Sequence, residues 1–139
     1  MQYTQAVRTT ADRSRTWRVL AAVTSYPQWT PSMTDVAGLD GDELAMGHRF
    51  RVRQPGLPVM VWRVTGLRDG EEFTWEARSP GVHTLASHRL STNADGSTEI
   101  TLRLEQTGPL AGFVRLLIGA KTRRYVALEA AGLKAAAES

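Results

Sequence analysis

Apolar and polar residues alternate in six short runs along the middle of the chain, and a turn-like segment rich in Gly, Pro, Asp or Asn follows most of these runs. Alternation with a period of two is typical of strands that bury one face. The links between the runs are too short to hold helices, so neighbouring strands are expected to pair antiparallel. The predicted strands span residues 33–39, 48–54, 59–67, 72–78, 82–90 and 97–107.

A strand and a helix are predicted before this series. Residues 2–9 alternate weakly and form a first strand, and residues 9–23 follow with helical spacing and one apolar stripe. Thr10 is the predicted N-cap of this helix because its hydroxyl can accept a hydrogen bond from a backbone N–H in the first turn. Pro27 is expected to end the helix, and residues 27–32 have room for only a turn or two.

A long helix is predicted over residues 109–137, with Pro109 at its first position, where proline is favoured. Such a helix is about 43 Å long at 1.5 Å per residue. Its apolar stripe is expected to bury against a wide apolar surface, which one face of an antiparallel sheet provides. The residues assigned to the stripe are Leu110, Val114, Leu117, Tyr125 and Leu128.

Strand parity predicts which side chains face this helix. Successive side chains of a strand point to opposite faces, so alternate positions share one face. The polar face of the predicted sheet is rich in Arg and Glu. The inner face collects bulky apolar side chains, namely Phe50, Val52, Met60, Trp62, Val64, Phe73, Trp75, Ile100, Leu102 and Leu104.

Length and composition indicate one domain over residues 1–139, with 42% hydrophobic and 22% charged residues, and the order of its strands and helices makes it α+β. The chain has no cysteine, and it has neither the apolar segment of a signal peptide nor a stretch long enough to span a bilayer. We therefore predict a cytoplasmic protein without integral membrane association. The net charge is +3, and Arg49, Arg51 and Arg53 share one strand face. Because no nucleic-acid-binding motif accompanies them, we expect this face to be solvated and predict no nucleic-acid partner.

The order of these elements resembles the SRPBCC superfamily, the START and Bet v 1-like proteins, and within it the polyketide cyclase/dehydrase and lipid-transport-like group. The resemblance rests on the segments 16–33, 46–65, 73–90 and 104–138 and covers essentially the whole chain in order. It implies a helix-grip fold: a seven-stranded curled antiparallel sheet wrapped around a long C-terminal helix, with one or two short helices between the first two strands. It also implies a cavity between sheet and helix that takes an apolar small molecule.

The parity argument and the resemblance together give a set of expected ligand-binding residues. The segment after the first helix is expected near the mouth of the cavity, and the strand ends are expected at its rim. The predicted ligand-binding residues are Trp29, Met33, Phe50, Gln54, Met60, Trp62, Phe73, Trp75, His88, Leu102, Leu117 and Tyr125.

Three residues are candidates for acid–base chemistry. His88 shares its strand face with Val82, Thr84, Ala86 and Leu90, and an inward histidine can act as a general acid or base or orient a ligand oxygen. Tyr125 and Arg124 on the long helix can bind or stabilise a ligand oxygen. With three histidines, no cysteine and no His-Glu-x-x-His spacing, we predict no metal site and no cofactor.

Two functions remain open at this point, together with a less favoured third. The first is binding of an apolar or aromatic small molecule, lipid- or polyketide-like, in the cavity. The alternative is a polyketide cyclase/dehydrase that acts on a ligand held there. The third is a module whose exposed groove takes a protein partner. The identity of the ligand and the oligomeric state are open as well, including a homodimer.

Overall fold

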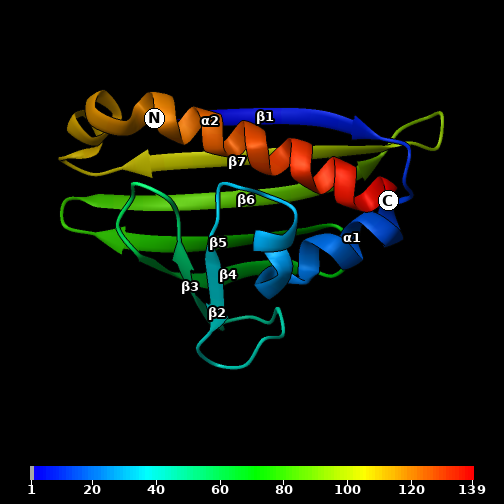
Figure 1. Cartoon of the computed structure of the whole chain (residues 1–139), viewed down its shortest axis with the longest axis horizontal. Coiled ribbons are helices and arrows are strands. Elements are labelled where there is room, and N and C mark those ends of the chain that lie inside the picture. The colour runs from blue at the N-terminus through cyan, green and yellow to red at the C-terminus, as the bar shows by residue number, and fades with distance from the viewer. Residues whose placement is uncertain (1) are drawn as a thin grey trace.

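The computed structural model describes residues 2–139 and confirms the predicted order of elements (Figure 1). Seven strands form one antiparallel sheet in the order β1-β7-β6-β5-β4-β3-β2, and the long helix α2 lies across one face of it. The elements are β1 (Gln2–Thr9), α1 (Arg13–Ala21), the 3-10 helix η1 (Val23–Gln28), β2 (Asp35–Gly38), β3 (Arg49–Arg53), β4 (Met60–Arg68), β5 (Glu72–Ser79), β6 (Val82–Thr92), β7 (Thr98–Thr107) and α2 (Ala111–Glu138).

The sheet is built by sequential hairpins, and β1 pairs with β7 at one edge. The predicted parity is confirmed across the central strands, where Phe50 lies opposite Trp62 and both are buried. The register shifts between Val64 and Gly66, where a bulge lets β4 curve against β5. The arginines of β3 lie on the exposed face, as expected of a solvated sheet surface.

The first helix begins later than predicted. Its N-cap is Asp12, whose carboxylate accepts a hydrogen bond of 2.7 Å from the backbone N–H of Arg15, so the assignment of Thr10 as N-cap is wrong. Thr10 lies before α1 and instead donates its backbone N–H to the carboxylate of Glu138 at the end of α2. The helix ends at Ala21, and Pro27 lies inside η1 rather than just after α1.

The face that α2 buries differs from the predicted stripe. The helix starts at Ala111, and its buried residues are mostly small: Ala111, Gly119, Thr122, Ala130, Leu133 and Ala137. Small side chains let the helix axis approach the sheet closely. The free energy gained by this close packing exceeds what burial of the larger apolar side chains would give. Leu117 is 65% exposed and Leu110 is 46% exposed, so their placement on the buried stripe is wrong.

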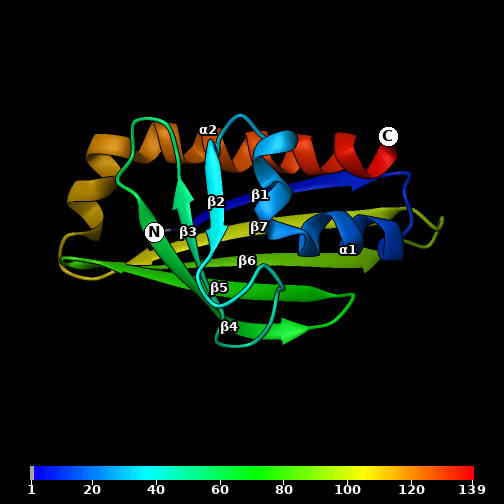
Figure 2. The ribbon, with the colours of Figure 1, turned by 60° about the horizontal axis from the view of Figure 1, so that its bottom comes forward.

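The space between sheet and helix is solid at one end. The C-terminal half of α2, together with α1 and η1, packs on Phe50, Phe73 and Leu102, which are almost completely buried. Figure 2 shows α1 and η1 lying beside this half of α2, and α1 and α2 are in contact. None of the described helices is both long and apolar enough to cross a lipid bilayer.

Candidate functional site

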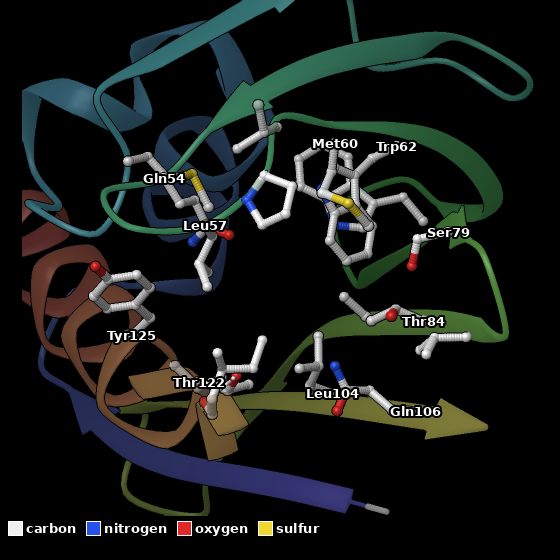
Figure 3. Close-up of a pocket in the computed structure, with 18 of the residues that line it drawn as sticks. Gln54, Leu57, Met60, Trp62, Ser79, Thr84, Leu104, Gln106, Thr122 and Tyr125 are labelled. Atoms are coloured by element: carbon white, nitrogen blue, oxygen red, sulfur yellow. Dashed lines mark hydrogen bonds between the residues drawn. The ribbon is translucent and has the colours of Figure 1, made fainter. Parts of the chain in front are cut away.

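A cavity of about 240 Å³ lies between the sheet and residues 114–129 of α2 (Figure 3). Its apolar wall comes from both sides, with Trp62 and Trp75 from the sheet and Val114, Ile118 and Val126 from the helix. The labelled side chains in Figure 3 surround an open space rather than interlocking across it. The inner face of the sheet is therefore solid core at one end and a cavity wall at the other.

Seven of the twelve predicted ligand-binding residues line this cavity. They are Met33, Gln54, Met60, Trp62, Trp75, His88 and Tyr125. Phe50, Phe73 and Leu102 face the same way but lie in the solid core, 0%, 0% and 3% exposed, so they support the wall without forming it.

Three predicted positions are corrected by the structure. Leu117 and Arg124 are exposed on the outer side of α2 and do not line the cavity, because the helix presents its small residues to the sheet. Trp29 does not line the cavity either. Its ring lies 4.8 Å from that of Tyr26, and its backbone packs against Gly132 at the solid end of the core.

His88 lies on β6 in the cavity wall, as the strand parity predicts, and is 3% exposed. Its ring stacks on Phe73 with centroids 4.1 Å apart and meets Trp75 edge-on at 5.7 Å. Its Nδ1 lies 3.3 Å from the carbonyl oxygen of Phe73. A carbonyl oxygen only accepts hydrogen bonds, so Nδ1 carries a proton and Nε2 is directed at the cavity side.

Glu129 of α2 also lines the cavity and contacts His88, and the sequence analysis missed it. Its Oε1 lies 3.3 Å from Nε2 of His88, and both side chains are largely buried, 4% and 13% exposed. The contact is not aligned as a hydrogen bond, and Oε1 accepts none from the described residues. Glu129 is four residues after Tyr125 and seven after Thr122, so helical spacing was the signal that places it on the inward face.

Tyr26 is completely buried and donates its hydroxyl to the backbone oxygen of Leu20 at 2.6 Å. Burial raises the pKa of this phenol well above its ordinary value, and the nearby negative charge of Glu129 raises the pKa further. Tyr26 therefore remains a neutral phenol, and its one proton is already committed to Leu20.

The loop between β3 and β4 forms part of the cavity wall. Tyr125 donates its hydroxyl to the carbonyl oxygen of Pro55 at 2.6 Å, which ties this loop to α2. Gln54 and Leu57 of the same loop line the cavity, as Figure 3 shows. At the opposite end of the wall Thr84 lies across from Gln106, and both are buried.

The other two histidines lie outside the cavity. Nε2 of His83 lies 2.7 Å from Oε2 of Glu76 on the outer face of the sheet, and this hydrogen bond lowers the pKa of Glu76. His48 binds the backbone oxygen of Glu43. Within residues 2–139 no three His, Cys, Asp or Glu side chains are grouped so that they could hold a metal ion.

Comparison with known proteins places the whole chain in one group. The family model described as "Polyketide cyclase / dehydrase and lipid transport" matches residues 1–138. No curated protein sequence matches the chain.

Solved structures show the same fold at low sequence identity. The Zhui aromatase/cyclase from a Streptomyces species superposes with a TM-score of 0.79 at 19% identity, covering 99% of this chain and 93% of that one. A START superfamily protein from Mycobacterium smegmatis superposes with a TM-score of 0.70 at 16% identity, covering 99% of this chain and 97% of that one. The Aha1 dimer from Colwellia psychrerythraea superposes with a TM-score of 0.74 at 17% identity, covering 99% of this chain and 96% of that one.

Proposed function

Because the chain belongs to the polyketide cyclase/dehydrase and lipid transport family of the SRPBCC superfamily, we propose that it binds an apolar or aromatic small molecule, lipid- or polyketide-like, between its sheet and α2. The observation that carries this proposal is the cavity itself. It is about 240 Å³ in volume, and its sheet wall includes two tryptophans, Trp62 and Trp75.

The size and lining of the cavity support this proposal. A cavity of about 150 Å³ with an apolar wall stays dry and takes up benzene, so 240 Å³ is enough for a somewhat larger ring system. Binding sites for small molecules are concave and mostly apolar, with a few placed polar groups. Here those groups are His88 and Glu129 on one side and the strand-end polar residues on the other.

A pair of neighbouring helix positions tests the proposal. Ile118 lines the cavity and Leu117 is exposed on the same helix, so Ile118→Trp fills the space while Leu117→Trp adds the same ring outside it. We expect wild type and Leu117→Trp to bind 2-methylnaphthalene in calorimetric titration and Ile118→Trp to lose the binding. Equal binding by both variants, or none by wild type, contradicts the proposal.

A second candidate function is favoured by the contact between His88 and Glu129. A cyclase/dehydrase needs a base that removes a proton from the carbon beside a ketone and an acid that returns a proton to a departing hydroxyl, which leaves as water. A histidine and a carboxylate that share a mostly apolar cavity provide both groups. The similarity in fold to a Streptomyces aromatase/cyclase supports this reading.

Proton abstraction can be measured with a simple ketone. We expect wild type to speed the exchange of the protons beside the carbonyl of 1-tetralone for deuterium, followed by NMR in D₂O. General acid–base catalysis contributes about 10²- to 10⁴-fold, so His88→Gln should remove most of the acceleration. No acceleration by wild type leaves the binding function alone.

A further inference from the structure

We infer that the cavity ligand is a neutral aromatic or polycyclic molecule with a hydroxyl group, and that this hydroxyl donates a hydrogen bond to Glu129 beside His88. The inference rests on the proposed binding function and narrows it to one class of ligand. It follows from a count of the donors and acceptors around this end of the cavity.

The hydroxyl groups near Glu129 already donate to backbone oxygens. The hydroxyl of Tyr26 goes to the backbone oxygen of Leu20, that of Thr122 to Ile118 and that of Tyr125 to Pro55.

The ring Nδ1–H of His88 is likewise directed at the backbone oxygen of Phe73. The side-chain amide of Gln106 lies across from Thr84, four residues along β6 from His88.

An acceptor is left without a donor. Oε1 of Glu129 is buried and accepts no hydrogen bond from the described residues. The neighbouring Nε2 of His88 is 3.3 Å away and off the line of a hydrogen bond, so it does not satisfy this oxygen. A buried carboxylate oxygen without a partner is costly, and a ligand that brings a donor removes that cost.

The charge of the cavity wall disfavours anionic ligands. Among the described residues that line the cavity none is lysine or arginine, and Glu129 is the one carboxylate. The one side chain of the wall that can become a cation, His88, already contacts Glu129. A fatty acid or aryl carboxylate that enters there therefore meets a like charge without a cation of its own, and like charges in a poorly solvated site repel strongly. A neutral hydroxyl meets an acceptor instead.

Three naphthalenes of similar shape test the inference by calorimetric titration at pH 7. They are 2-naphthol, which is neutral and carries a donor; 2-methylnaphthalene, which has no polar group; and 2-naphthoate, which is an anion. We expect wild type to bind 2-naphthol at least about tenfold more tightly than 2-methylnaphthalene, the usual gain of a hydrogen bond to a charged group. 2-Naphthoate should bind most weakly.

Removing the carboxylate should erase this order. In Glu129→Gln we expect the advantage of 2-naphthol to shrink to within about threefold, and 2-naphthoate to gain affinity. Glu71→Gln removes the same charge from a solvent-exposed turn, where Glu71 pairs with Arg68, and should keep the wild-type order.

The possible outcomes separate the inference from the proposed function. Equal affinity of wild type for 2-naphthol and 2-methylnaphthalene overturns the hydroxyl inference and leaves apolar binding in place. Failure of wild type to bind any of the three overturns both. Should Glu129→Gln fail to fold by circular dichroism, the order of the three affinities in wild type decides by itself.

Discussion

The imidazole of His88 and the carboxylate of Glu129 lie 3.3 Å apart, although the residues are 41 positions apart in the chain and come from opposite walls of the cavity. One belongs to β6 in the middle of the sheet and the other to α2. Their contact marks the boundary between the solid core, where His88 stacks on Phe73, and the cavity beyond it. The polar groups of the cavity thus lie beside the packed core.

The buried face of α2 can be tested with two leucines of the same helix. Leu133 is completely buried and Leu117 is 65% exposed. We expect Leu133→Ala to lower the free energy of unfolding by about 2–5 kcal/mol, because it loses apolar burial and leaves a cavity. Leu117→Ala should change it by less than about 0.5 kcal/mol. Urea denaturation measures both, and similar losses in the two variants would show that the helix is rotated from the face described.

Two glycines of α2 should respond to alanine in opposite directions. A Cβ at Gly132 meets the carbonyl oxygen of Trp29 and lies 2.9 Å from its ring carbon Cε3, whereas a Cβ at Gly112 has no neighbour within 4 Å. Gly132→Ala should therefore lower the free energy of unfolding by about 1–3 kcal/mol through overpacking. Gly112→Ala should stabilise by up to about 1 kcal/mol through better helix propensity. Thermal unfolding of both variants checks the signs, and stabilisation by Gly132→Ala contradicts the close approach of Trp29.

The sheet was predictable because its periodicity is simple. A period of two places Phe50, Trp62, Trp75 and His88 on one face whatever the exact ends of the strands. All four are buried on the inner face. The antiparallel pairing was also predictable, because the short turns between the strands allow no parallel crossover.

The helix face was not predictable in the same way. Apolar residues surround the N-terminal half of α2, and Leu116 and Leu117 are 82% and 65% exposed although they are larger than the residues buried in that half, which are Ala111, Gly119 and Thr122. The rotation of the helix is set by how closely its small residues approach the sheet, which depends on tertiary contacts. Glu129 was missed for a related reason, because a single glutamate in a helix is usually on the surface.

The hydrogen bond between Tyr125 and Pro55 is expected to hold the β3–β4 loop over the cavity. Tyr125→Phe removes the donor without changing the ring. We expect hydrogen–deuterium exchange of the peptide 54–59 to become several-fold faster, while global stability falls by only about 1 kcal/mol. Tyr3→Phe is the matched control because the hydroxyl of Tyr3 has no hydrogen-bond partner among the described residues. Unchanged exchange in Tyr125→Phe would show that other contacts hold the loop.

The outer-face pair of Glu76 and His83 predicts a dependence of stability on pH. The hydrogen bond from His83 lowers the pKa of Glu76 in the folded state, while in the unfolded state this pKa returns to about 4.3. The stabilisation is therefore present above pH 4.3 and is lost as the pH falls through the folded-state pKa.

Glu76→Gln should consequently lose up to about 1 kcal/mol of unfolding free energy at pH 6, and the difference from wild type should shrink as the pH approaches 3. Urea denaturation at pH 6, 4.5 and 3 measures this convergence. Glu99→Gln, at an outer-face position of β7, serves as the control and should show a difference of less than about 0.5 kcal/mol at each pH. A difference for Glu76→Gln that stays constant from pH 6 to pH 3 would mean that the carboxylate charge is not what His83 stabilises.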